Sequence, residues 1–212
     1  MILFNLPKEL VKPLHRHIVR APVHEADLVW RCHAALIGTD TCIVAQEQYS
    51  QYIMVFCGVT TEQFANFPQY FTDRFWREAA AICKQADLYD SATLRQQLQA
   101  IASEQVYRLD PEPLEEGKLI KVMEKLERRF LYDREPLPVD GRAAFTYSYD
   151  INSRQPTLDK AQGKPTAAEA FGDICLNLID LRIDADREKV KAAVVASEDN
   201  IITVDFGRNR DS

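Results

Sequence analysis

Three short runs rich in β-branched and aromatic residues constrain the fold of this chain most. They cover residues 28–37, 41–47 and 51–57. Gly38-Thr39-Asp40 separates the first two runs, and a polar turn near Tyr49-Ser50 separates the second from the third. Runs of this length and composition, bounded by turn residues, are typical of β-strands. The simplest arrangement is a three-stranded antiparallel meander.

Amphipathic helices are expected after the meander. Pro68 suits the first turn of a helix that runs to about residue 86, and Arg74 and Glu78 fall in its polar half. Asp90-Ser91 begins a further helix. The spacing of three and four residues between apolar positions predicts another helix from residue 118 onwards, with the stripe Leu119, Met123, Leu126 and Phe130.

Three more stretches are predicted to be strands. Apolar and polar residues alternate over 145–151, as in a half-buried strand. After a helix that starts near Pro165 and ends at about residue 183, runs 190–196 and 201–206 have the pattern of a hairpin. Strands then come in clusters with helices between them. The predicted fold is therefore α+β, with an antiparallel sheet (the N-terminal meander plus later strands) packed with several amphipathic helices.

A length of 212 residues is enough for one compact domain without disulfides or metal. We expect one domain over residues 1–212, and the alternative is a subdivision in the 133–141 loop.

Part of the chain resembles a known family. The matching segments are Cys32-His33-Ala34-Ala35-Leu36-Ile37, Thr41-Cys42-Ile43-Val44, Met54-Val55-Phe56-Cys57-Gly58-Val59, Phe64 and Phe71. They resemble an uncharacterised bacterial family known only as a domain of unknown function, over roughly residues 28–80. Members carry a tryptophan where this chain has Cys32, and here Trp30 stands two residues earlier. The resemblance implies a shared fold and a bacterial protein, and it transfers no activity and no functional residue.

Sequence signatures of catalysis are missing. The chain has no Gly-rich phosphate loop, no dinucleotide fingerprint, no His-Glu-x-x-His pair and no Gly-x-Ser-x-Gly elbow. Its five cysteines are widely spaced without a Cys-x-x-Cys pair, which is typical of reduced core cysteines. We therefore expect no catalytic residue, no cofactor and no metal site.

Charge and hydropathy narrow the set of partners. With 26 basic and 32 acidic residues the formal net charge is -6, which disfavours nucleic acid and anionic membranes. No apolar run approaches the roughly 18 residues needed to span a bilayer, and the N-terminus lacks the basic flank of a signal peptide. We expect a soluble cytoplasmic protein without a membrane partner.

One helix face carries a local excess of positive charge. Lys121, Lys125 and Arg128 lie off the apolar stripe of the helix from residue 118, so they are the candidate binding residues. The alternative is an ordinary solvated face, which Glu124 supports because it precedes Arg128 by four residues as in a helical ion pair. Aromatic residues are not interleaved with these charges, as single-strand nucleic acid binding would require.

These observations favour a non-enzymatic bacterial binding or regulatory protein that acts through its surface, with a protein partner or a second copy of the chain. Two alternatives stay open. One is a small-molecule enzyme with a site assembled from distant residues, which a pocket of converging charged groups would favour. The other is a nucleic-acid-associated accessory protein that uses the basic helix.

Overall fold

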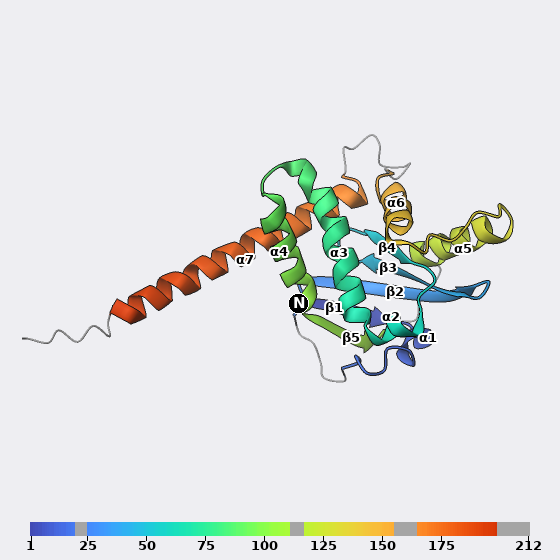
Figure 1. Ribbon diagram of the computed structural model, residues 1–212, viewed down its shortest axis with the longest axis horizontal. Helices are drawn as coiled ribbons and strands as arrows, with labels where there is room; N and C mark the ends of the chain where they lie inside the picture. Colours follow the sequence, from blue (N-terminus) through green and yellow to red (C-terminus); the bar gives the residue numbers. More distant parts are fainter. Residues whose placement is uncertain (20–24, 111–116, 155–164, 199–212) are drawn as a thin grey trace, which may run out of the picture.

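A computed structural model describes residues 1–19, 25–110, 117–154 and 165–198 of the chain, with side chains through residue 189 apart from residue 85 (Figure 1). Its centre is a five-stranded sheet in the order β4-β3-β2-β1-β5. The strands are β1 (Ile2–Leu6), β2 (Leu28–Ile37), β3 (Asp40–Glu47), β4 (Ile53–Phe56) and β5 (Gln105–Leu109).

The predicted meander is confirmed, and the prediction of an antiparallel sheet is wrong. Strands β2, β3 and β4 pair antiparallel. Strand β1 instead lies between β2 and β5 and is parallel to both, so the sheet is mixed. All five residues of β1 are buried, and its sequence Ile-Leu-Phe-Asn-Leu is a nearly continuous apolar run. Such a run is typical of a strand covered on both faces, where no alternation is visible.

Seven α-helices are described in this part of the chain, besides a short 3-10 turn. They are α1 (Lys8–Val11), α2 (Thr61–Ala65), α3 (Phe67–Cys83), α4 (Ser91–Ser103), α5 (Lys118–Leu131), α6 (Gly141–Asn152) and α7 (Ala167–Glu198), and η1 (Lys84–Ala86) extends α3. Asp90 caps α4 and Asp140 caps α6, because each aspartate accepts hydrogen bonds from two backbone N–H groups of the first turn.

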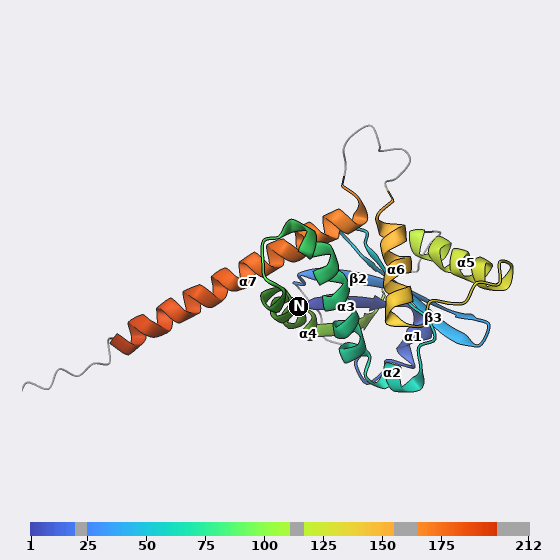
Figure 2. The ribbon, with the colours of Figure 1, turned by 45° about the horizontal axis from the view of Figure 1, so that its top comes forward.

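Helices α3, α4 and α7 cover one face of the sheet (Figures 1 and 2). The core beneath them is aromatic: the rings of Trp30 and Phe171 meet edge-to-face at 5.9 Å, and Tyr52 stacks on Phe171 at 4.4 Å. Arg74 and Glu78, in the predicted polar half of α3, are buried here. They form an ion pair, and Tyr52 donates its hydroxyl hydrogen bond to Glu78 over 3.1 Å.

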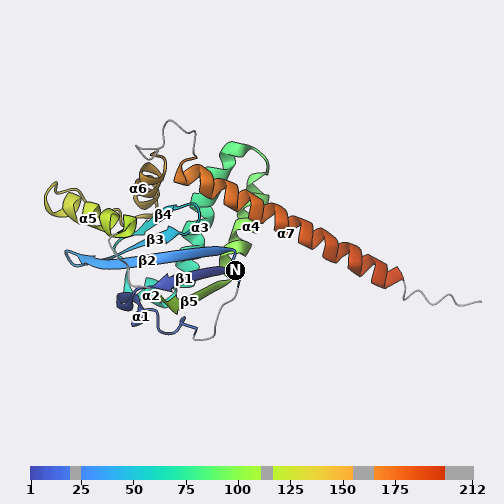
Figure 3. The ribbon, with the colours of Figure 1, turned by 180° about the vertical axis from the view of Figure 1, so that it is seen from behind.

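Helix α5 packs across β2 and β3 on the opposite face of the sheet, and α6 packs on the edge strand β4 (Figure 3). Side chains of α6 form hydrogen bonds with the backbone of β4. Asn152 accepts from Ile53 N (2.9 Å) and donates to Ile53 O (2.7 Å), and Ser148 Oγ accepts from Val55 N (3.1 Å). Side chains of a helix thus occupy hydrogen-bonding positions at which a sheet edge could pair with another strand.

Two predicted strand regions are helical. Residues 145–151 lie in α6, because Ala144, Ser148 and Asn152 recur at four residues and turn one helical face inwards, a period that the 145–151 alternation hid. Residues 190–196 belong to α7, which extends to Glu198 rather than to about residue 183. The second strand of the predicted hairpin, 201–206, lies outside the described residues. Figures 1 and 3 show that the C-terminal half of α7 projects away from the rest of the molecule.

Candidate functional site

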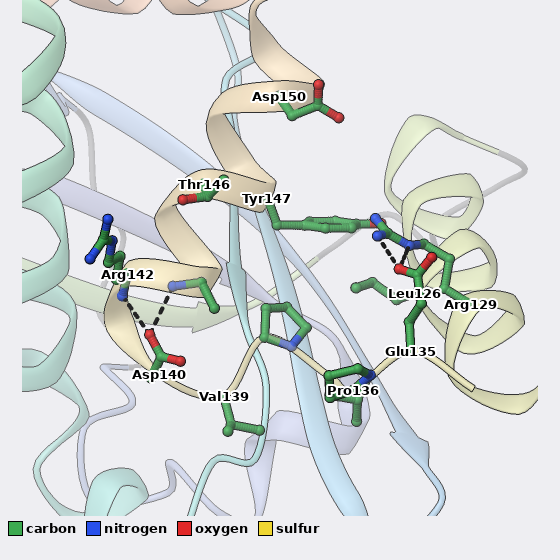
Figure 4. Close-up of a pocket in the computed structure, with 13 residues that line it drawn as sticks. Leu126, Arg129, Glu135, Pro136, Val139, Asp140, Arg142, Thr146, Tyr147 and Asp150 are labelled. Carbon is green, nitrogen blue, oxygen red and sulfur yellow. Dashed lines mark hydrogen bonds and ion pairs between the residues drawn. The ribbon is translucent and has the colours of Figure 1, made fainter. Parts of the chain in front are cut away.

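A pocket of about 720 Å³ lies between α5 and α6. The loop over residues 135–140 closes it from a third side (Figure 4). We call it the α5–α6 pocket. A different local sequence feature determines each of the three walls. Helix α5 forms through its apolar stripe, the Pro136-Leu137-Pro138 segment cannot continue a helix and forms the loop, and the Asp140 cap starts α6.

The lining of the pocket is apolar with charged groups around it. Leu126 and Leu137 are buried, and Val139 is exposed at 55 %. Figure 4 shows the ring of Tyr147 pointing from α6 towards Arg129 of α5. An apolar cavity with a few oriented polar groups is the usual form of a binding site.

Arg129 organises the α5 side of the pocket. Its Nε donates to Glu135 Oε2 over 2.5 Å, and its guanidinium carbon lies 5.2 Å from the centroid of the Tyr147 ring. Burial raises the pKa of Tyr147 above its ordinary value, and the Arg129 charge opposes that rise. The phenol therefore stays neutral at physiological pH, and Tyr147 offers an aromatic surface rather than an ionisable group.

The carboxylates of the pocket already have partners. Asp140 accepts from the backbone N–H groups of Arg142 (2.9 Å) and Ala143 (2.8 Å). Asp150 is paired with Arg154 at 2.5 Å, and Glu135 is paired with Arg129. Thr146 is the lone aliphatic hydroxyl among the described lining residues, which include no histidine, cysteine or lysine. This arrangement suits binding better than nucleophilic or acid–base catalysis.

The structure places the sequence-predicted residues Lys121, Lys125 and Arg128 on the exposed side of α5. At about 100° per residue, Lys125 lies about 40° around the helix from Arg129, and Lys121 and Arg128 lie about 80° to 100° away in the same direction. The basic face therefore borders the side of α5 that opens into the pocket. We call Lys121, Lys125 and Arg128 the basic face of α5.

Lys118, the first residue of α5, has a different role from the rest of the helix. Its Nζ donates to the backbone oxygen of Gln51 over 3.1 Å, and partial desolvation of the amine lowers its pKa from the ordinary value. It ties the start of α5 to the turn before β4.

The sequence pattern did not locate the pocket because one of its walls, α6, was wrongly predicted. Residues 145–151 were predicted to be a strand, which placed Tyr147 in a sheet. The signals that could have located the pocket are Asp140, with its cap position three residues before Ala143, and the proline pair that holds the preceding loop outside a helix.

Other kinds of site find little support in the described residues. No three His, Cys, Asp or Glu side chains among them lie close enough to hold a metal ion. The five cysteines are free thiols, and each is buried. None of the helices in this part of the chain has the length and apolar composition needed to cross a membrane.

Comparison with known proteins adds no assignment. No protein-family model matches the chain, and no curated protein matches it. The resemblance of residues 28–80 to a bacterial family stays a prediction.

Proposed function

We propose that this protein is a non-enzymatic binding protein that docks an acidic segment of a partner protein on the basic face of α5, with an apolar side chain of that segment in the α5–α6 pocket. The observation that carries the proposal is the adjacency of the two features. An apolar cavity and a positively charged helix face share the border marked by Arg129.

Charge supports an acidic partner. The exposed positions of α5 include four basic residues and two acidic ones, a local surplus of two positive charges: Lys118, Lys121, Lys125 and Arg128 against Glu124 and Glu127. The chain as a whole carries -6. A local positive surface on an acidic protein steers acidic partners to one place and repels them elsewhere.

Exposed apolar side chains support a protein partner. Leu131 and Tyr132, at the end of α5, are 52 % and 79 % exposed, and Val139 is exposed in the loop beside the pocket. Exposed apolar groups next to a charged rim are typical of interaction surfaces. A segment docked here would bury them.

The test begins with peptides selected from a displayed random library by the whole chain. We expect the selected peptides to combine Asp or Glu with an aliphatic or aromatic residue. The variant K121E/K125E/R128E should bind them about tenfold or more weakly, because each rim contact contributes about 0.2 to 1 kcal/mol and reversal adds repulsion. The matched control K8E/K12E/R16E changes two lysines and one arginine that are exposed around α1.

A second variant addresses the pocket. Thr146→Trp places a large ring at an exposed lining position, so it should weaken the same peptides while melting like the parent protein. Equal binding by the parent, the triple variant and Thr146→Trp would contradict the proposal. If the basic face instead bound DNA or RNA oligonucleotides in a salt-dependent manner and no acidic peptide was selected, the nucleic acid alternative would replace it.

A further inference from the structure

A second cavity, of about 480 Å³, lies on the sheet face at the β1 and β5 side. Side chains from four strands and the turn before β4 line it, including Asn5, Arg31, Gln46, Gln51, Arg108 and Asp110. We call it the sheet-face pocket. Its described lining is entirely polar or charged, in contrast to the α5–α6 pocket.

Strand register builds this pocket. Asn5 of β1 lies directly opposite Arg31 of β2 and directly opposite Arg108 of β5, and Arg31 lies opposite Gln46 of β3. Directly opposite residues point to the same face of a sheet. The four side chains therefore form one row across β5, β1, β2 and β3. With about 4.8 Å between neighbouring strands, the two arginine Cα atoms lie about 10 Å apart.

Neighbouring side chains fix both guanidinium groups. Arg31 donates from Nε to Asp110 Oδ2 (2.7 Å) and from Nη2 to Oδ1 (3.2 Å), and the Asp110 side chain is only 6 % exposed. Arg108 donates from Nε to Asn5 Oδ1 over 2.7 Å. Its other N–H groups make no hydrogen bond to another residue of the described ranges, so they can reach a ligand.

The described charges of the pocket favour an anion. Two arginines face one aspartate, which leaves one surplus positive charge on the side of Arg108. Lys118, which is not among the lining residues, donates to the backbone oxygen of Gln51 at the edge of the pocket. A guanidinium with free N–H groups matches the geometry of phosphate and carboxylate oxygens.

Amide side chains complete the lining. Gln46 donates to Gln51 Oε1 over 2.8 Å, and Gln51 holds a left-handed backbone conformation (φ 61°) that is unfavourable for a residue other than glycine. Amide groups both donate and accept, so they match hydroxyl groups. No aromatic ring occurs among the described lining residues that could stack on a base.

From this arrangement we infer that the sheet-face pocket binds a small, polar, non-aromatic molecule through an oxyanion group, phosphate or carboxylate, held by Arg108. Sugar phosphates and hydroxy acids have this chemistry. The inference is independent of peptide docking on α5. The proposed binding is non-covalent, because the described lining contains no histidine, cysteine, serine or lysine.

Isothermal titration of the full chain tests the inference, with inorganic phosphate, glucose 6-phosphate and citrate as probes. At least one probe should bind with a Kd below about 1 mM. Arg108→Gln should weaken that probe about tenfold or more, and Arg108→Lys should retain part of the affinity because it keeps the charge without the planar fork. Phosphate and carboxylate ligands are distinguished by which probe binds more tightly.

Two further variants make the result decisive. Arg16→Gln is the matched control, since it removes the same charge from an exposed residue that follows α1, outside both pockets and the basic face of α5, and should leave probe binding unchanged. Gln46→Glu adds a negative charge to the pocket without touching Arg108, so it should weaken binding even if Arg108→Gln fails to fold. The inference is wrong if no probe binds at about 10 mM, or if Gln46→Glu binds the probe as the parent does.

Discussion

Replacement of Arg74 by methionine should make the stability of this protein strongly dependent on pH. Arg74 and Glu78 are 5 % and 1 % exposed, and Arg74 donates to the carboxylate from Nε over 3.0 Å. Burial raises the pKa of Glu78, while Arg74 and the Tyr52 hydroxyl oppose the rise. Removal of the guanidinium leaves burial unopposed by a cation, so the pKa of Glu78 rises further.

The magnitude follows from linkage. A carboxyl whose pKa is higher in the folded than in the unfolded state binds its proton more tightly when folded, so stability falls as pH rises above the unfolded value. The ordinary value is 4.5. Each pH unit between 4.5 and the folded pKa removes about 1.4 kcal/mol, so three units, up to pH 7.5, remove at most about 4 kcal/mol. This agrees with the roughly 3 to 5 kcal/mol that breaking a buried ion pair costs.

The assay is urea unfolding of the parent and Arg74→Met at several pH values from 4.5 to 7.5. We expect the difference in unfolding free energy to grow with pH. The double variant Arg74→Met/Glu78→Leu should recover most of the loss at pH 7.5, because no charge is left buried. If Arg74→Met lowers the unfolding free energy by the same amount at pH 4.5 and at pH 7.5, the electrostatic explanation is refuted and lost packing accounts for the effect.

Three further predictions concern the surroundings of the two pockets. Asn152→Ala removes both hydrogen bonds to Ile53 at the sheet edge and should lower the unfolding free energy by about 1 to 3 kcal/mol in denaturant melts; an unchanged midpoint would show that water replaces the side chain. Gly58→Ala should cost about 1 to 2 kcal/mol, because φ is +66° and the new Cβ would lie 3.0 Å from Val139 Cγ1, and Val139→Ala should relieve only the steric part. Alkylation followed by mass spectrometry should label none of the five cysteines before unfolding, since all are buried and burial raises the pKa of Cys32 to about 12; rapid labelling of the native protein would disprove that burial.

Local sequence pattern was sufficient for the elements whose partners are close in sequence. The meander β2-β3-β4 was predicted because each strand pairs with the next across a short turn. Helices α3, α4 and α5 followed from caps and apolar spacing. These signals lie within a few residues of one another.

The rest of the fold depends on contacts between distant segments. Strand β1 is an interior strand of the sheet because it pairs in parallel with β5, about a hundred residues later, and no local signal specifies that partner. Arg74 and Glu78 lie on the polar half of a projected helix, and they are buried because they neutralise each other beside Tyr52. A helical projection ranks residues by polarity and cannot anticipate such pairing.

The candidate site was predicted in part. The sequence located Lys121, Lys125 and Arg128 on a polar helix face, and the structure places them there. The cavity beside them requires α6, whose residues alternate in polarity over 145–151, a pattern that predicts a strand and not a helix. The sheet-face pocket depends wholly on register, since Asn5, Arg31 and Arg108 meet only through the parallel pairing of β1.

The most direct test of peptide docking is nuclear magnetic resonance of the isotope-labelled chain during titration with a selected acidic peptide. Docking on the basic face predicts the largest shift changes at Lys121, Lys125, Arg129 and Tyr147, with resonances of Arg31 and Arg108 in the sheet-face pocket unchanged. Shift changes that concentrate on another surface, with α5 and α6 unaffected, would contradict the account.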